Sequence, residues 1–306
     1  MRPGLLAELP LYRKFLVVSF LVMLGSITFS MLASLLISGI WGLSASDLLV
    51  AEGEKHVDAM KLLVLIGTGF GSFTIPSLLG AFLLFKSPLE ELGFRKPEGG
   101  APSAMFALIA LLFSLPLINF MVMMNEFMVL PESLSGVEQW MKEAEEQMHN
   151  ITEAMLLANS TSDLLTNLLV IAVVPAIAEE LLFRGLIQNL FGKLSSNKHL
   201  AIWISAALFS AIHMQFYGFL PRMVLGAVFG YMLLWSGSLW LPILAHFANN
   251  GIAVLLSFVN QSSTNPIIDE NEVGKGSGDL WLVALSVLIA GFCMYQIKKR
   301  GLQSAR

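Results

Sequence analysis

Long apolar segments separated by short polar connections make up most of the chain. A transmembrane helix needs about 20 apolar residues to cross a hydrocarbon core of about 30 Å. Eight segments approach that length, at 15–43, 62–85, 103–124, 164–190, 199–214, 220–235, 239–259 and 280–297. The first is longer than the apolar region of a signal peptide, roughly 7 to 15 residues, so we expect a retained helix. The pattern predicts an all-α polytopic membrane helix bundle with about eight transmembrane helices.

The composition agrees with a membrane protein. Of the 306 residues, 56% are hydrophobic and 13% are charged, whereas about 25% are charged in typical soluble domains. Nothing in this composition supports nucleic-acid binding. The chain has one cysteine, Cys293, within the last apolar segment, so it forms no intramolecular disulfide.

The connections between the apolar segments alternate in charge. With eight crossings, all the basic clusters fall on one side of the membrane: Arg2, Arg13 and Lys14; Lys86, Arg95 and Lys96; Lys193 and Lys198; and Lys298, Lys299 and Arg300. By the positive-inside rule that side is cytoplasmic, which places both termini in the cytoplasm. Short basic loops without a retention signal favour a bacterial cytoplasmic membrane.

The connection before the fourth apolar segment is long and acidic. Its apolar residues recur at helical spacing between the acidic ones: Val137, Trp140, Met141, Ala144, Met148, Ile151 and Met155. This spacing indicates an amphipathic helix, either lying on the outer membrane face or packed as a cap on the bundle.

We divide the chain into four regions on these patterns. Residues 1–130 hold the first three transmembrane helices, and 131–163 form the acidic extracytoplasmic segment. Residues 164–259 contain four further helices and the candidate catalytic residues. Residues 260–306 comprise an extracytoplasmic loop, the last transmembrane helix and a basic cytoplasmic tail.

Charged residues occur inside the fourth apolar segment. Inserting an ionisable side chain at the centre of a membrane helix costs about 2.5 to 3.5 kcal/mol, so such a residue indicates a functional site. Glu180 and Arg184 are four residues apart, so they share a helix face and can neutralise each other. Glu179 lies about 100° round the helix from Glu180. It is left without a local cation and is a candidate general base.

Two further polar pairs lie in later apolar segments. Phe209 and His213 are four residues apart, as are His246 and Asn250. Two neutral donors side by side on a helix face, as in the second pair, can hold a developing oxyanion. Counting residues from the cytoplasmic edge places Glu179 and His213 about 20 Å deep and His246 about 10 Å deep, so tilt or a shifted boundary is needed if they meet.

Together these residues resemble the signature of the CAAX prenyl endopeptidase type II family of intramembrane proteases, also called CPBP or ABI. That signature runs Glu-Glu-x-x-x-Arg, Phe-x-x-x-His and His-x-x-x-Asn, in the order found here. The resemblance covers about 164–259, and "LGFRKP" at 92–97 is similar to a pattern in bacterial members. It implies an intramembrane endopeptidase that hydrolyses a peptide bond of a membrane-associated or lipidated substrate.

The resemblance also implies a role for each residue of the motifs. Glu179 and His213 would activate a water molecule, and His246 and Asn250 would stabilise the oxyanion. Glu180, Arg184 and Phe209 would support the site.

The cofactor question stays open between two alternatives. Glu179, His213 and His246 supply the ligand types of a catalytic zinc. No His-Glu-x-x-His motif is present, and Asn250 beside His246 suits an oxyanion hole better than a metal shell, which favours a mechanism without metal.

Two other functions compete with proteolysis. One is a non-catalytic membrane partner, such as a bacteriocin-immunity or scaffold protein that keeps the same fold. The other is a transporter that uses Glu179 and the histidines as a proton relay, although the sequence lacks the internal repeat of many transporters. For the protease, the partners would be a peptide or protein substrate in or at the membrane and the lipid bilayer; the sequence specifies no oligomeric state.

Overall fold

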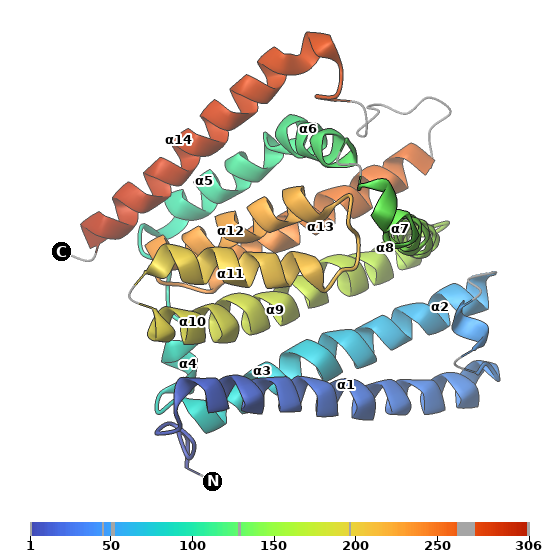
Figure 1. The fold of residues 1–306 in the computed structure, drawn as a ribbon, viewed down its shortest axis with the longest axis horizontal. Coiled ribbons are helices and arrows are strands. Elements are labelled where there is room, and N and C mark those ends of the chain that lie inside the picture. Colours follow the sequence, from blue (N-terminus) through green and yellow to red (C-terminus); the bar gives the residue numbers. More distant parts are fainter. Residues whose placement is uncertain are drawn as a thin grey trace.

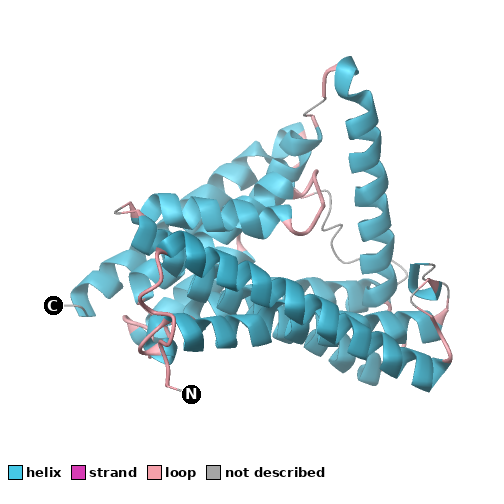
Figure 2. Ribbon diagram, turned by 60° about the horizontal axis from the view of Figure 1, so that its bottom comes forward, coloured by secondary structure: helices cyan, strands magenta, loops and turns pink. Residues whose placement is uncertain are grey.

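The computed structural model describes residues 2–44, 46–49, 53–127, 130–195, 197–261 and 273–304. The chain is 82% helical, and the described residues contain no strand, so Figure 2 shows only helices joined by loops. The predicted all-α membrane bundle is therefore confirmed.

Each predicted apolar segment forms one pass along the bundle, and successive passes run in opposite directions (Figure 1). The passes are α1 (Leu11–Trp41); α2 (Glu54–Leu63), η2 (Val64–Thr74) and α3 (Ile75–Leu84); α5 (Gly100–Leu112) and α6 (Leu115–Glu126); α8 (Thr161–Asn167), η4 (Leu168–Val173), α9 (Val174–Glu180), η5 (Leu181–Gln188) and α10 (Asn189–Leu194); α11 (Lys198–Ala211); α12 (Phe219–Ser236); α13 (Trp240–Gln261); and α14 (Leu280–Ser304). Shorter helices and the crosswise α7 connect them: η1 (Asp47–Leu49), α4 (Pro88–Glu91), η3 (Glu132–Leu134), α7 (Ser135–Leu156) and η6 (Ser277–Asp279). The two ends of the chain lie at the same end of the bundle (Figure 1).

The passes differ in length. Among the described residues, six helices are long and apolar enough to cross a membrane, and the count is seven if α5 and α6, which are bent by 47° at the break between them, are taken as one span. α11 is shorter than expected: it has 14 residues, about 21 Å at 1.5 Å per residue. The connection that follows α11 is held to α6, where Asn125 Nδ2 donates a hydrogen bond of 2.6 Å to the Phe216 carbonyl.

Helix α7 lies across the other helices, so Figure 1 views it nearly end-on. The Trp140 ring packs on the Phe216 ring with 5.2 Å between centroids, and the Tyr217 backbone N–H donates to Glu145 Oε2 over 3.2 Å. Near the other end of α7, Met155 is buried in a cluster with residues of α2 and η4. The acidic segment therefore packs on the bundle as a cap; contact of the same helix with the outer membrane face stays a prediction.

The first two passes approach each other closely through glycines. A Cβ on Gly71 would lie 2.4 Å from Phe29 Cβ, and a Cβ on Gly25 would lie 2.1 Å from the Gly71 carbonyl oxygen. Small residues permit such close backbone contact between membrane helices, where lipid supplies little hydrophobic driving force for association. This contact fixes α1 against η2.

The loop 92–97 covers the turn between α12 and α13. Leu239 N–H donates to the Gly93 carbonyl over 2.8 Å, and Leu239 and Leu92 are both buried in the same apolar cluster as η5. Arg95 Nε donates to the Gly237 carbonyl on the opposite side of the turn. The loop therefore covers the turn before α13, where Leu239 and Leu241 are buried and Trp240 is 51% exposed.

Candidate active site

The two adjacent glutamates lie where the helix changes its winding. Glu179 and Glu180 end α9, and the π-helical segment η5 begins at the next residue. All residues of η5 except Ile187 are buried. π-Helical turns occur often at functional sites. The charged side chains thus face neighbouring helices instead of lipid.

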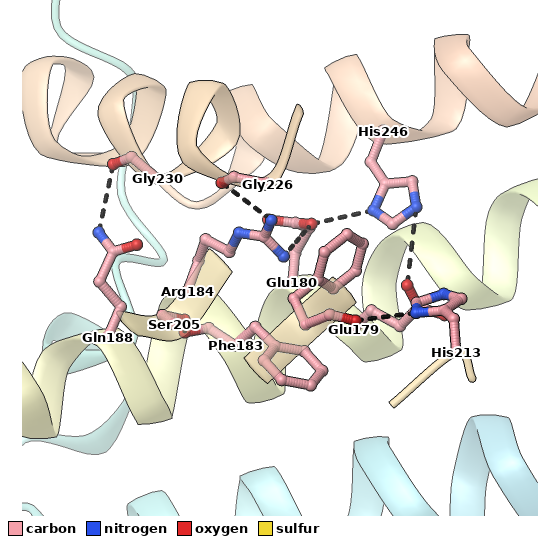
Figure 3. Close-up of polar contacts among 11 residues, drawn as sticks. Glu179, Glu180, Phe183, Arg184, Gln188, Ser205, His213, Gly226, Gly230 and His246 are labelled. Carbon is pink, nitrogen blue, oxygen red and sulfur yellow. Dashed lines mark hydrogen bonds and ion pairs between the residues drawn. The ribbon is translucent and has the colours of Figure 1, made fainter. Parts of the chain in front are cut away.

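Glu180 lies between two basic side chains (Figure 3). Its Oε1 is 3.0 Å from Arg184 Nη1 and 2.9 Å from His246 Nδ1. Arg184 Nη2 also donates to the Gly226 carbonyl of α12 over 3.0 Å. Glu180 is fully buried and Arg184 is 1% exposed, and a buried charge of this kind is tolerated only when it is paired. The predicted Glu180–Arg184 pairing is present, with His246 as a third member.

Phe209 lies at the centre of an aromatic cluster that joins the three motifs. Arg184 Cζ is 4.4 Å from the centre of its ring, and the ring centroids of His213 and His246 are 5.1 and 5.9 Å away. On the other side of His246, Phe229 of α12 stacks at 5.2 Å with an interplanar angle of 23°. These rings fix the positions of both imidazoles.

Glu179 has a different environment from its neighbour. It is 9% exposed, and its Oε2 lies 3.8 Å from His246 Nε2, longer than a hydrogen bond. Among the described residues it has no closer ion-pair partner. Glu180 is thus bonded to both Arg184 and His246, whereas Glu179 has no partner within hydrogen-bond distance of its carboxylate among the described residues.

His213 lies in the turn that ends α11. Its Nδ1 is 2.8 Å from the Phe209 carbonyl, and since a carbonyl oxygen only accepts, Nδ1 carries the hydrogen. Met214 then turns the chain away with φ of 54°, a conformation uncommon outside glycine. The neutral imidazole therefore keeps a lone pair on Nε2 that can accept a proton.

His246 and Asn250 differ from the expected pair of free neutral donors. His246 Nδ1 already donates to Glu180, so its Nε2 carries a hydrogen only in the imidazolium form. Asn250 Nδ2 donates to the Ile171 carbonyl over 3.0 Å. The structure thus places His213 and His246 at the Phe209 ring and Glu179 beside His246, and holds Asn250 one helical turn further along α13.

The residues proposed as zinc ligands do not form a metal site. In the described part of the chain, no three His, Cys, Asp or Glu side chains are grouped to hold a metal ion. The donor types suit zinc, but Glu179 Oε2 and His246 Nε2 are 3.8 Å apart, and His246 Nδ1 is bonded to Glu180. We therefore derive no step through a metal.

Sequence reasoning missed three residues of this region. Phe229 and Gln188 lie in apolar segments and belong to none of the three motifs, yet Gln188 is buried and its Nε2 donates to the Gly230 carbonyl (Figure 3). Arg222, in the first turn of α12, donates from Nη2 to Gln215 Oε1 over 2.6 Å, and its Nη1 is buried. The signal for Arg222 was its charge in an otherwise apolar segment next to the short connection "QFYGF".

Comparison with known proteins agrees with the three motifs. The family model of the type II CAAX prenyl endopeptidase Rce1-like proteins matches residues 161–252, which hold all three motifs. "Uncharacterized protein YpbD" of Bacillus subtilis (strain 168) is 32% identical over 76 residues, 24% of this chain and 35% of that protein. The match thus spans about a third of the curated relative. No solved structure matches the chain. The resemblance inferred from the motifs is confirmed.

Proposed function

We propose, from the premise that residues 161–252 belong to the type II CAAX prenyl endopeptidase family, that the protein is an intramembrane endopeptidase. It would hydrolyse a peptide bond of a membrane-associated or lipidated substrate. This proposal rests on one observation: two adjacent buried carboxylates have different environments. Glu180 is bonded to Arg184 and His246, whereas Glu179 forms no hydrogen bond with His246, which lies 3.8 Å away.

In the proposed mechanism, Glu179 takes a proton from a water molecule as that water attacks the scissile carbonyl. The Nε2 lone pair of His213 accepts a second hydrogen bond from the same water and orients it. A positioned base of this kind contributes roughly 10²- to 10⁴-fold in rate. The proton then passes from Glu179 to the leaving amine, which restores the carboxylate.

The oxyanion of the tetrahedral intermediate would be stabilised by His246. The imidazolium form donates from Nε2 to the oxyanion and from Nδ1 to Glu180, and the Glu180 carboxylate stabilises that charged form. Asn250 has two amide hydrogens, and one of them is bonded to the Ile171 carbonyl. We propose that the second reaches the oxyanion once substrate occupies the site.

The proposed setting is a bacterial cytoplasmic membrane with both termini in the cytoplasm. The chain is an integral multi-pass membrane protein. The basic clusters and the two termini share one end of the bundle (Figure 1), which supports a cytoplasmic assignment of that end. We keep the four-region division as a proposal, with the chemistry in 164–259; residues 262–272 of its fourth region lie outside the described residues.

The test compares new peptide termini in host membranes that express wild type, Glu179→Gln or Glu153→Gln at matched folded levels. Glu153 is an exposed residue of α7, so its variant controls for loss of one carboxylate. We expect termini that appear with wild type and Glu153→Gln and are absent with Glu179→Gln. Identical termini in all three membranes would overturn the protease assignment and favour a non-catalytic membrane partner.

A further inference from the structure

A polar cavity lies at the end of the bundle that carries the basic clusters. It is formed between α4, η5 with α10, the start of α11 and the end of α12, and its volume is about 360 Å³, within the roughly 300 to 1,000 Å³ of small-molecule sites. Arg184 and Gln188 line it as buried residues, and Arg95, Lys193 and Lys198 line it as exposed ones. The cavity therefore has a buried inner wall and a cationic rim.

Two of the four cations that line the cavity are already paired with carboxylates. Arg184 Nη1 is 3.0 Å from Glu180 Oε1, and Lys193 Nζ is 2.8 Å from Glu91 Oε2. Each of these pairs is close to neutral, so neither is the source of an excess charge in the cavity.

The other two cations are bonded to backbone carbonyls, which do not cancel a positive charge. Arg95 Nε donates to the Gly237 carbonyl, and Lys198 Nζ donates to the Gly192 carbonyl over 3.1 Å. Within the described residues neither forms an ion pair, and both groups have more N–H donors than these bonds use. The remaining carboxylate in the lining is the exposed Glu90. The cavity thus carries an excess of positive charge and unused donors at its rim.

The inner wall offers an acceptor instead of a donor. Gln188 Nε2 donates to the Gly230 carbonyl over 3.2 Å (Figure 3), and Gln188 Oε1 is buried with no hydrogen-bond partner among the described residues. A buried acceptor without a partner is costly, and a hydroxyl group would satisfy it where an ionised phosphate oxygen would not. A ligand that suits both parts of the cavity therefore carries an anionic group and a hydroxyl.

We propose that this cavity binds a phosphate ester of a polyol, with the phosphate at Arg95 and Lys198 and a hydroxyl at Gln188. Guanidinium and ammonium groups both bind phosphate, and basic pockets between membrane helices on the cytoplasmic side bind phosphorylated headgroups. The same chemistry is found in the phosphoglycerol headgroup of a lipid and in a free polyol phosphate. The site lies apart from Glu179 and His246, which do not line it, so the inference does not depend on proteolysis.

The experiment measures thermal unfolding of the whole protein in phosphatidylcholine nanodiscs. In one arm sn-glycerol 1-phosphate is added to the solution, and in the other phosphatidylglycerol replaces part of the phosphatidylcholine. We expect the unfolding midpoint to rise by at least about 3 °C. A rise in the second arm alone identifies a lipid headgroup as the ligand, and a rise in the first arm identifies a free phosphate ester.

Matched variants separate the cavity from the general charge of this end of the protein. Lys198→Gln should remove the rise, and Lys299→Gln, at an exposed lysine of α14 outside the cavity, should keep it. Arg95→Gln provides a second test if Lys198→Gln does not fold. Glu90→Gln should increase the rise, because it removes the carboxylate that opposes an anion.

Three results would overturn the proposal. The first is an unchanged midpoint in both arms, and the second is a rise that survives both Lys198→Gln and Arg95→Gln. The third is a rise that Lys299→Gln reduces as much as Lys198→Gln does, because general attraction of anions to the basic surface would then explain it. Inorganic phosphate, which lacks the polyol, should stabilise less than sn-glycerol 1-phosphate, and an equal effect of the two would contradict the hydroxyl contact at Gln188.

Discussion

Two long apolar helices of this chain differ in what surrounds them. In α1, 6% of the most apolar window is buried inside the protein, and in the helix from Thr161 to Leu194 the figure is 39%. α1 is held by close backbone contact at Gly25 and Gly71. The second helix carries Glu179, Glu180 and Arg184 among side chains of α11, α12 and α13.

The difference shows which helices of a membrane protein can carry charged side chains. A carboxylate on the lipid side of α1 would have no partner, and its insertion would be costly. On the enclosed helix, Arg184 and His246 compensate Glu180, and that framework allows Glu179 to remain without a close cation. The charged residues of the candidate site are therefore carried by the helix that other helices enclose.

Removing the buried cation should have the largest effect on stability. Arg184→Ala leaves Glu180 with His246 alone and leaves the Gly226 carbonyl without its donor. Breaking a buried ion pair typically costs about 3 to 5 kcal/mol. We expect little folded protein in detergent by fluorescence-detected size-exclusion chromatography. A monodisperse Arg184→Ala protein with unchanged thermal stability would show that the pair does not hold the helix.

Filling the glycine contact of α1 should have the next largest effect. An alanine at Gly71 places a Cβ against Phe29 and the Gly25 carbonyl, and overpacking costs about 1 to 3 kcal/mol. Gly39→Ala is the control, because nothing lies within 4 Å of a Cβ there. Thermal unfolding of the purified variants should show destabilisation for Gly71→Ala only, and equal midpoints for both would argue against the contact.

Loosening the cap should have a smaller and local effect. Trp140→Ala removes the ring that packs on Phe216, and such aromatic pairs contribute about 0.5 to 1.5 kcal/mol beyond burial. Amide hydrogen exchange should quicken at Tyr217, whose N–H bonds to Glu145, and stay unchanged in α9. Faster exchange throughout the bundle would mean that α7 supports the whole fold.

Truncating a lipid-facing residue of α1 should have the smallest effect. Leu35 is 70% exposed, and lipid tails are as apolar as leucine, so Leu35→Ala should change the free energy of unfolding by less than about 0.5 kcal/mol. Unfolding in nanodiscs measures this change. A clear loss of stability would indicate that another protein surface, rather than lipid, covers α1.

Hydrophobic pattern alone was enough to predict the fold class and the segment that forms each pass. Spacing of four residues also identified the Glu180–Arg184 pair, because the i, i+4 rule depends on the helix itself. The depth of His246 was not predictable in this way. Residue counting gave His246 a smaller depth than Glu179, whereas the structure places the two side chains 3.8 Å apart.

The remaining parts of the site depend on contacts between distant elements. Asn250 binds the backbone of Ile171, and a backbone acceptor leaves no sign in a sequence pattern. Arg222 is recognisable only when the connection after α11 is seen under α7 and its free Nη1 is found. Local spacing therefore predicts which residues share a helix face, and tertiary contacts decide which of them meet.

The central claim is that Glu179 acts chemically and Glu180 acts structurally. The most direct test measures thermal stability and new peptide termini in parallel for Glu179→Gln and Glu180→Gln. Our account predicts that Glu179→Gln unfolds at the wild-type temperature and produces none of the wild-type termini, whereas Glu180→Gln, which weakens the bonds to Arg184 and His246, is clearly destabilised. A stable Glu179→Gln protein that still produces the wild-type termini would contradict it.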